Sequence, residues 1–327
     1  MKVRVLNEAE TRKLIGPRAA IAECREAFAK LARGEVEQPD VLTIEIPEHH
    51  GEVHGKGGYL HGAPFFSIKV ATGFYENPKR GLPVTSGAVW VFDATTGLLR
   101  VMILDNGFLT ELRTGAAGAI AADLLARADA ATVGIVGAGT QARYQLEALL
   151  EVRAPTRVLV WSRNPARAAE YAAEMTERFG RNVEPVARAE DLVAQSDIVV
   201  TTTPADEPVV QAAWVRPGTH ITAMGSDMAH KRELEASLLG GATVVADRLK
   251  QCLTQGEIHH AVAAGVLRAD QVHAELGDVA AGLKPGRRSA AEITIADLTG
   301  VGVLDAAVAN YVAARAEIED VGRWIEA

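Results

Sequence analysis

The chain has 327 residues, and its 34 lysines and arginines against 42 aspartates and glutamates give a formal net charge of −8. With 48% hydrophobic and 23% charged residues, the composition is typical of an ordinary globular protein of roughly two domains, which excludes a disordered chain. The acidic balance also excludes a nucleic-acid-binding protein, because neutralising phosphates requires clustered lysine and arginine.

The two cysteines, Cys24 and Cys252, lie far apart and follow no metal-ligand spacing. We therefore expect no disulfide framework and no metal site, and a reducing cytoplasm fits best. Charges are scattered through the N-terminal residues, which lack an apolar signal core, and no stretch reaches the ~18 uninterrupted apolar residues of a membrane helix. These features predict a cytoplasmic protein with no membrane partner.

The first part of the chain has the pattern of a sheet with a helix. Apolar residues at helical spacing predict an amphipathic helix from Pro17 to Leu31. Four β-rich runs follow, at 41–47, 51–60, 65–75 and 87–104, and Thr96-Gly97 marks a hairpin turn inside the last run. This part is expected to form an antiparallel or mixed sheet with one or two helices.

From Thr110 onward the pattern changes to alternating strands and helices. An alanine-rich helix at 110–127 is followed by strand-like and helical segments in turn, ending with a strand at 292–300 and a helix at 305–318. Such alternation predicts βαβ crossovers and a parallel sheet, so the fold class is α/β with a doubly wound parallel sheet. The last helix is expected to pack back on the first domain, and the basic segment 284–288 to be a solvated loop.

The strongest local signal is the run GAGTQA. It closes the apolar strand TVGIV and opens a helix, which is the context that a dinucleotide fingerprint requires. Gly137 would make the tight turn, Gly139 would admit the pyrophosphate, and Ala142 would let the helix pack closely on the strand. Thr140 and Gln141 stand at the helix N-terminus, where free N–H groups favour phosphate. The run predicts an NAD(P)(H) site, and a glycine turn in another α/β sheet is the alternative.

The end of the second strand usually distinguishes NAD from NADP, because a carboxylate there binds the ribose 2′-hydroxyl and an arginine accommodates a 2′-phosphate. The run Val160–Asn164 contains no carboxylate. Ser162 and Arg163 suit a 2′-phosphate, which favours NADP(H) and leaves NAD(H) open. An arginine at the start of an exposed helix is otherwise often merely solvated.

Two further strand ends carry polar or small residues, and ligands of doubly wound sheets gather at the carboxyl ends of strands. The predicted cofactor contacts there are Thr202, Thr203, Met224, Gly225 and Ser226. The next residue, Asp227, would stand near the nicotinamide, where a carboxylate can hold or relay a proton. Its alternative role is to cap a helix that begins near His230.

Four cationic or titratable side chains lie among apolar residues and glycines in the first domain. Lys69 interrupts the apolar strand FFSIKV, where a charge is costly to bury without a partner. His54 and Lys56 alternate along a strand and so face one side of it, and Arg113 begins an otherwise apolar helix. Together they predict a cationic pocket in which Arg113 clamps a substrate carboxylate in a bidentate manner. Each residue alone is more typical of an ordinary surface charge.

At these residues the chain resembles the ornithine cyclodeaminase/μ-crystallin family over nearly its whole length. The resemblance is carried by segments 67–83, 92–97, 109–119, 134–142, 200–204, 223–234 and 297–307. The segments EVHGKGGY, MGSDMAHKREL and DLTGVGV are most similar to the ectoine-utilisation branch of that family.

The resemblance implies a Rossmann-type NAD(P)-binding domain, residues 119–302, inserted in an α+β substrate-binding and dimerisation domain, residues 1–118 plus 303–327. It implies a homodimer formed through the sheet of that second domain. It also implies that Lys69 and Arg113 hold the substrate carboxylate, that Thr114 touches the cofactor, and that Asp227 works beside the reacting carbon. This chain departs from the cyclodeaminases of the family at two places. Cyclodeaminases carry an arginine near the position of Asp40 and an acidic residue near the position of Lys56, whereas this chain has QPDVL and HGKGG there.

Three functions follow as hypotheses. The first is an NAD(P)H-dependent imine (ketimine) reductase or amino-acid dehydrogenase acting on a small polar α-imino acid. The alternative is a cyclodeaminase that converts a diamino acid to a cyclic imino acid, with release of ammonia and recycled NAD⁺. Lys56 argues against it, because the second amine of the substrate would meet a cation. The third is a nucleotide-bound binding protein, which the presence of Lys69, Arg113 and Asp227 together disfavours.

Overall fold

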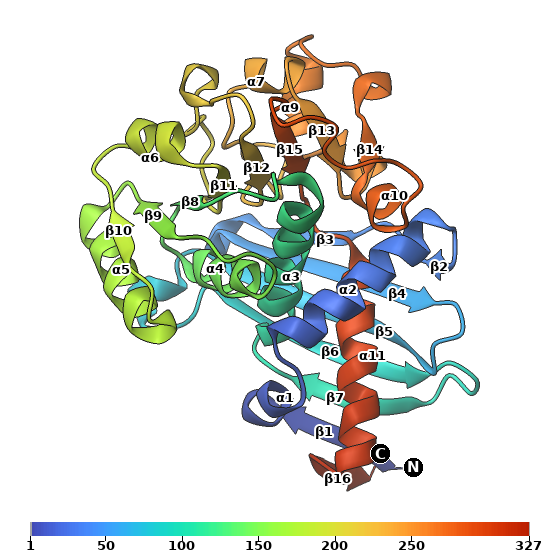
Figure 1. The fold of residues 1–327 in the computed structure, drawn as a ribbon. Coiled ribbons are helices and arrows are strands. Elements are labelled where there is room, and N and C mark those ends of the chain that lie inside the picture. The colour runs from blue at the N-terminus through green and yellow to red at the C-terminus, as the bar shows by residue number, and fades with distance from the viewer. Residues whose placement is uncertain (1, 327) are drawn as a thin grey trace. The chain divides into compact units, whose positions relative to one another are not determined.

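The structure is a computed structural model that describes residues 2–326, and the chain divides into two compact units (Figure 1). The first unit comprises Met1–Arg113 and Val301–Ala327, and the inserted unit comprises Thr114–Gly300. The chain passes from the first unit to the inserted one within helix α3 (Phe108–Leu125) and returns just before helix α11 (Gly302–Glu319). The expected domain boundaries, 118/119 and 302/303, lie within α3 and within the first turn of α11. The predicted α/β fold class is confirmed.

The first unit is built on a mixed sheet in the order β16-β1-β7-β6-β5-β4-β2, with β3 paired to β4. Among the described strand pairs of this sheet, only β1 and β7 run parallel. Asp93 forms the predicted turn at Thr96-Gly97 by accepting the backbone N–H groups of Thr95 and Thr96, and Gly97 has φ +70°. The four predicted runs are strands, whereas β1, β2 and β16 were not predicted. The strands are β1 (Lys2–Asn7), β2 (Val36–Glu37), β3 (Leu42–Ile46), β4 (Gly51–Leu60), β5 (Phe65–Phe74), β6 (Thr85–Asp93), β7 (Leu99–Leu104) and β16 (Arg323–Glu326).

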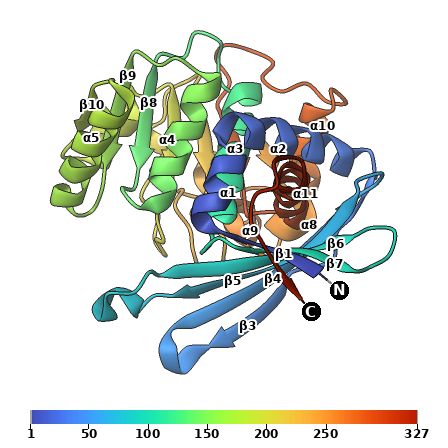
Figure 2. The same cartoon turned by 90° about the horizontal axis from the view of Figure 1, so that it is seen from below.

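Helices of the first unit cover one face of this sheet (Figure 2). They are α1 (Glu8–Leu14), α2 (Pro17–Ala32) and α11, and α11 contacts β4, β5 and α2. Pro17 suits the start of α2 because the first helical N–H needs no partner within the helix. The opposite face of β3, β4 and β5 carries no described helix of this unit, and Leu42, Ile44 and Ile68 are exposed there by 63%, 50% and 47%. We call these three residues and their surroundings the open sheet face.

The inserted unit contains a parallel sheet in the order β10-β9-β8-β11-β12-β15-β13-β14. The order reverses between β8 and β11, which is the topology of a doubly wound dinucleotide-binding sheet. Of its strands, the sequence predicted five and missed β10, β13 and β14. The strands are β8 (Thr132–Val136), β9 (Arg157–Trp161), β10 (Val183–Pro185), β11 (Ile198–Thr201), β12 (His220–Ala223), β13 (Thr243–Ala246), β14 (Ala274–Glu275) and β15 (Thr294–Asp297).

Helices cover both faces of the parallel sheet, and each face has its own hydrophobic core. Ile135 and Val200 pack with Leu146 on one face, whereas Val199 and Ile221 belong to the core on the other face. Burial on both faces explains why these strands are almost continuously apolar. The helices are α4 (Thr140–Val152), α5 (Pro165–Phe179), α6 (Ala189–Gln195), α7 (Ser237–Gly240), α8 (Leu249–Cys252), α9 (Gly256–Ala263) and α10 (Leu276–Ala280).

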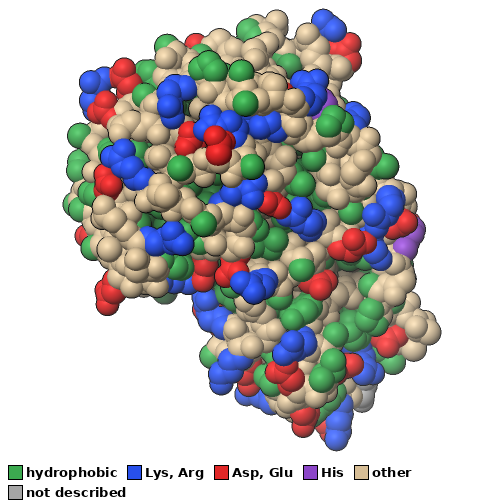
Figure 3. Space-filling view, in the orientation of Figure 1, with side chains coloured by type: hydrophobic (Ala, Val, Ile, Leu, Met, Phe, Trp, Pro, Cys, Tyr) green, Lys and Arg blue, Asp and Glu red, His purple; other side chains and the backbone are tan. Residues whose placement is uncertain are grey.

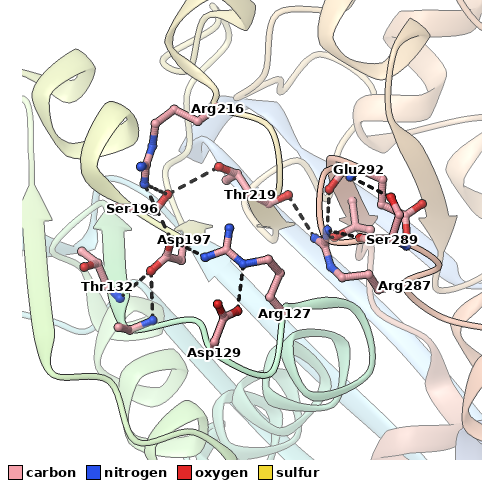
Figure 4. Close-up of polar contacts among 12 residues, drawn as sticks. Arg127, Asp129, Thr132, Ser196, Asp197, Arg216, Thr219, Arg287, Ser289 and Glu292 are labelled. Carbon is pink, nitrogen blue, oxygen red and sulfur yellow. Dashed lines mark hydrogen bonds and ion pairs between the residues drawn. The ribbon is translucent and has the colours of Figure 1, made fainter.

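A polar network ties the amino ends of these strands together (Figure 4). Asp197, just before β11, accepts the backbone N–H of Thr132 at 3.0 Å and pairs with Arg127 at 3.0 Å. Arg287 donates to the hydroxyl of Thr294 at 2.8 Å and to the carbonyl of Thr219 at 3.3 Å. The prediction of a solvated loop at 284–288 is therefore wrong for Arg287, which is half-buried because its guanidinium satisfies backbone carbonyls and hydroxyls at this edge.

Candidate active site

The fingerprint turn follows β8 and requires glycine at two positions for different reasons. Gly137 has φ +116°, and its N–H donates to the carbonyl of Trp161 at 2.8 Å. A Cβ added at Gly137 would lie 2.5 Å from Thr202 Oγ1, whereas one at Gly139 would meet nothing within 4 Å. The first glycine therefore permits the turn, and the second leaves open space in front of α4, which begins at Thr140. Such an open helix N-terminus suits a pyrophosphate.

Arg143, which sequence reasoning missed, stabilises this turn from the side of α4. Its guanidinium donates to the carbonyls of Ala138 and Gly139 at 2.9 and 3.0 Å and also pairs with Glu174. Because these two carbonyls belong to the fingerprint itself, Arg143 holds the turn without contacting the open space beside Gly139. The sequence signal that could have identified this role is an arginine three residues after the start of the helix that follows the glycines. Ala142 is fully buried, as the predicted close packing of helix on strand requires.

The loop after β9 contains Ser162 and Arg163 and carries no carboxylate. Ser162 Oγ accepts the backbone N–H of Asn164 at 3.3 Å, and Asn164 in turn caps α5. Arg163 is exposed, and among the described residues it has no ion-pair partner. The structure thus leaves a guanidinium available at the position that distinguishes the two dinucleotides.

Gln145 links two of the predicted cofactor residues. Its amide nitrogen donates to the carbonyl of Thr114 at 2.9 Å and lies 3.2 Å from Gln141 Oε1. Gln145 is buried inside α4 and was not predicted. Thr114, at the start of the inserted unit, is therefore held close to the fingerprint helix.

The ends of β11 and β12 meet at a buried carboxylate that the sequence did not indicate. Glu233 accepts hydrogen bonds from the backbone N–H of Thr203 and of Gly225, at 2.5 and 2.7 Å. Thr202, on the other side, donates its N–H to the carbonyl of Val136 at 2.9 Å, so the ends of β8 and β11 are also joined. The predicted residues Thr202, Thr203, Met224, Gly225 and Ser226 therefore share the carboxyl edge of one sheet with the fingerprint.

Asp227 does not cap a helix. No described helix begins between it and α7, so that alternative is wrong. Its side chain is 52% exposed and accepts a hydrogen bond from Lys231 Nζ at 2.7 Å, whereas the Lys231 side chain is largely buried. The pairing fixes the direction of an exposed carboxylate just beyond β12, and Lys231 was not predicted.

In the first unit, Lys69 and Arg113 converge on one oxygen of Asp305. Lys69 Nζ lies 2.7 Å and Arg113 Nε 3.0 Å from Asp305 Oδ1, and the three residues are 2%, 6% and 3% exposed. Thr110, one helical turn before Arg113, accepts a further hydrogen bond from Lys69 at 3.1 Å. Asp305 Oδ2 is buried and has no hydrogen-bond partner within residues 2–326. The terminal nitrogens of Arg113 donate no hydrogen bond to a described residue.

Glycines in β4 bring Asp305 to this position. A Cβ at Gly302 would lie 2.9 Å from the carbonyl of Gly57, and one at Gly58 would lie 3.3 Å from Ala306 Cβ. The N-terminus of α11 therefore rests directly on β4, and Gln38 caps it by accepting the N–H of Val303 at 2.8 Å. Asp305 stands in the first turn of α11, where the helix dipole also favours a carboxylate.

Burial and neighbouring charges set the protonation of this cluster. Burial, together with the charges of Arg113 and Lys56, lowers the pKa of Lys69 to about 7 against the opposing effect of Asp305. Burial would raise the pKa of Asp305, but the charges of Arg113 and Lys69 outweigh burial and lower it. The carboxylate is therefore ionised at neutral pH, and Lys69 is close to its titration point.

Lys56 and His54 face the same side of the sheet as Lys69. In the register of β4 and β5, Lys56 pairs with Lys69 and His54 pairs with Ala71. Both side chains are half-buried, and His54 Nε2 lies 3.7 Å from Glu52 Oε1. The strand register places Lys56 beside Lys69, and the sequence gave no sign of Asp305.

The doubly wound sheet with a glycine turn at the N-terminus of α4 defines a dinucleotide-binding protein. Residues 1–320 match the ornithine cyclodeaminase/mu-crystallin family, and the chain belongs to that family. The family resemblance is thereby confirmed, while the ectoine-utilisation branch stays a prediction.

Solved structures that resemble this chain over nearly its full length include three with bound dinucleotide. An archaeal alanine dehydrogenase dimer with NAD is 36% identical with a TM-score of 0.94, covering 100% of this chain and 99% of that one. The Δ¹-pyrroline-2-carboxylate reductase of Thermococcus litoralis with NADH and L-proline is 34% identical with a TM-score of 0.94, covering 98% and 99%. The iminosuccinate reductase of Paracoccus denitrificans with NAD⁺ is 35% identical with a TM-score of 0.90, covering 100% of both.

A lysine cyclodeaminase has the same fold, at 31% identity and a TM-score of 0.88, covering 100% of this chain and 96% of that one. The family therefore contains both net reductases and cyclodeaminases close to this chain. Within residues 2–326, no group of three or more His, Cys, Asp or Glu side chains is arranged to hold a metal ion, and no helix is both long and apolar enough to cross a bilayer.

Proposed function

We propose that the protein is an NAD(P)H-dependent imine (ketimine) reductase, or amino-acid dehydrogenase, acting on a small polar α-imino acid. The observation that carries the proposal is the buried cluster of Lys69 and Arg113 on a single carboxylate, in a family whose relatives include an iminosuccinate reductase and an alanine dehydrogenase. Two buried cations that share one anion have a net positive charge, and a substrate carboxylate would neutralise it.

Arg113 and Lys69 would bind that carboxylate. Arg113 uses only Nε for Asp305 among the described residues, so its two terminal nitrogens can form the bidentate pair with which guanidinium recognises a carboxylate. Lys56 and His54, on the same face, would receive a polar or anionic group on the substrate side chain. A small polar imino acid satisfies both requirements.

The reaction class follows from the dinucleotide site and from Asp227. When bound, the reduced nicotinamide supplies the hydride for the C=N carbon, and the α-imino acid becomes an α-amino acid. Asp227, directed by Lys231, would hold or supply the proton on the substrate nitrogen, directly or through a water molecule. The cationic cluster contributes orientation, which can account for much of the rate enhancement of such a step.

We infer a preference for NADP(H) from the loop after β9. The absence of a carboxylate there and the exposed guanidinium of Arg163 support it. The structural relatives contain NAD, NADH or NAD⁺, so both dinucleotides belong in every assay.

A cyclodeaminase is the second candidate, favoured by the likeness to lysine cyclodeaminase. Such an enzyme must accommodate a second amine on the substrate. Lys56 lies opposite Lys69 in the sheet and would repel that amine. The reductase therefore ranks first.

We also propose a homodimer that forms through the open sheet face, and a cytoplasmic location. The exposed Leu42, Ile44 and Ile68 and a neighbouring hollow of about 370 Å³ beside Tyr59 and Phe66 support such an interface. The alanine dehydrogenase relative is described as a dimer. Cys24 and Cys252 are buried free thiols, as expected in a reducing compartment.

The test is consumption of NADPH and of NADH with a panel of α-keto acids, including pyruvate and oxaloacetate, in the presence of ammonia or methylamine. Oxidation of either dinucleotide with one keto acid and amine pair supports the reductase, and the faster dinucleotide decides the preference. Ammonia release from ornithine or lysine with NAD⁺, without any reductive turnover, would replace the reductase by the cyclodeaminase.

A further inference from the structure

Glu233 lies between the ends of β11 and β12 and makes four hydrogen bonds there. Its Oε1 accepts from the backbone N–H and the hydroxyl of Thr203, at 2.5 and 2.7 Å. Its Oε2 accepts from the hydroxyl of Thr201 at 2.6 Å and from the backbone N–H of Gly225 at 2.7 Å. The side chain is fully buried.

The pattern of donors requires a carboxylate and excludes an amide. An ionised carboxylate accepts about four hydrogen bonds and donates none. Each oxygen of Glu233 accepts from one backbone N–H, which can only donate. In either orientation, therefore, the NH₂ group of a glutamine would face a backbone N–H, and one buried donor would lose its acceptor.

The surrounding backbone is built closely around this carboxylate. A Cβ added at Gly225 would lie 2.6 Å from Glu233 Oε2, so only glycine allows the approach. Behind it, Glu257 of α9 accepts the backbone N–H of Glu233 at 2.7 Å and of Leu234 at 3.1 Å, and it also accepts the hydroxyl of Ser226. Glu233 is thus fixed from both sides.

The two strand ends that Glu233 joins lie beyond the reversal of strand order. In a doubly wound sheet, β8 and β9 bind the first mononucleotide, and the strands beyond the reversal bind the second. The fingerprint, by contrast, has its own support from Arg143 and makes no hydrogen bond with Glu233 in the described structure.

We propose that Glu233 is a positioning residue for the nicotinamide half of the dinucleotide site, acting through Thr203 and Gly225. The inference rests on the proposed dinucleotide-dependent function and adds a residue that selectively organises one half of that site. Glu233 itself would touch neither dinucleotide nor substrate.

The charge state of Glu233 gives this role a pH signature. Burial and the nearby charge of Glu257 raise the pKa of Glu233 to about 7, against the hydrogen bonds from Thr201 and Thr203. Glu257 is the titratable group that faces it from α9, while β11 and the loop after β12 present hydroxyl and backbone N–H groups. A proton on Glu233 removes an acceptor site, so affinity for NADH should fall as the pH drops below about 7.

The experiment measures dissociation constants of NADH, NADPH and ADP by titration calorimetry, from about pH 6 to about pH 8.5, for the wild type, Glu233→Gln and Glu235→Gln. Glu235 is a matched control because its partners are the N–H of Ala212 and the hydroxyl of Ser237, and a glutamine satisfies both. ADP probes the first mononucleotide half alone.

We expect Glu233→Gln to weaken NADH and NADPH binding about tenfold or more at pH 8, to flatten its pH dependence, and to leave ADP affinity within about twofold. Unchanged NADH binding in Glu233→Gln would overturn the proposal. Equal weakening of ADP and NADH would overturn it as well, because it would indicate general damage. Failure of the wild type to bind either dinucleotide would instead reject the proposed function.

Discussion

Two buried cations of the first unit depend on one carboxylate that lies far away along the chain. Lys69 is in strand β5, Arg113 is in helix α3, and Asp305 comes from α11, 236 positions after Lys69. The sequence indicated that a lysine in an apolar strand needs a partner, but a hydrogen-bond partner at such a separation leaves no local pattern. Without the Asp305 carboxylate, two buried cations would lose their anion in a place that solvent cannot reach, so the loss of this carboxylate should be costly.

Asp305→Asn should lower the free energy of unfolding by about 3–5 kcal/mol, because two buried cations would lose their anion. Urea unfolding measures the change. Glu317→Gln, near the end of the same helix, is the control, because Glu317 pairs with Arg100 and both side chains are exposed. A loss at position 305 no greater than at position 317 would mean that the cluster is not ionic.

Lys69 should confer a pH dependence on substrate binding. Its pKa of about 7 means that it is charged below that pH and increasingly neutral above it. The KM for the amino acid in the oxidative direction should therefore rise more steeply above pH 7 in the wild type than in Lys69→Arg, because arginine stays protonated. Parallel pH profiles of KM in the two proteins would contradict a carboxylate-binding role for Lys69.

The element that the sequence identified most completely is the turn between β8 and α4. Its residues are contiguous, and each glycine has a local reason: a positive φ at Gly137 and open space at Gly139. Arg143, which supports the turn, and Gln145, which bonds Thr114 and Gln141, also lie in α4, yet neither residue belongs to the motif. Local conformational requirements are therefore visible in the sequence, whereas the side chains that stabilise them become evident only from the hydrogen bonds.

Gly137→Ala should abolish measurable dinucleotide binding, because the added Cβ is strained at φ +116° and meets Thr202 Oγ1 at 2.5 Å. Fluorescence titration with NADPH tests this expectation. Gly180→Ala is the control, since Gly180 also has a positive φ, of 61°, but it ends α5 in open space. We expect that control to lose about 1 kcal/mol of stability and to keep its affinity. NADPH affinity that is equally retained in both variants would reject the fingerprint.

On the scale of the whole molecule, two surface features bear on partners. On the face shown in Figure 3, lysine and arginine side chains are interspersed with aspartate and glutamate, so this face has no broad basic area for nucleic acid. The open sheet face is different, because its exposed leucine and isoleucine side chains suit a second copy of the chain.

Ile68→Glu should convert the proposed homodimer to a monomer, because it places a charge on each copy in an apolar contact related by two-fold symmetry. Sedimentation velocity distinguishes the two species. Ile318→Glu serves as the control, since Ile318 is 79% exposed on α11, away from that sheet face. A wild type that is monomeric, or a dimer that survives Ile68→Glu, would contradict the proposed interface.

Local sequence patterns predicted the class of fold, the four central runs of the first sheet and the fingerprint, and they singled out Lys69, Arg113 and Asp227 as candidate site residues. These features depend on periodicity, on glycine conformation or on the cost of a charge among apolar neighbours, all of which act over a few residues. The short strands β10 and β14 contain too few residues for a periodic pattern, whereas β13 is as long as the predicted β11 and was missed all the same.

The side chains that complete these features become known from the packing of the folded chain. Asp305 reaches Lys69 because glycines at 57, 58 and 302 let a helix lie directly on a strand. Glu233 joins the ends of two neighbouring strands from a position 30 residues after Thr203. Lys231 directs Asp227 in a segment that has no described helix. Buried polar groups must find partners wherever the fold brings them, so their identity depends on packing rather than on local sequence.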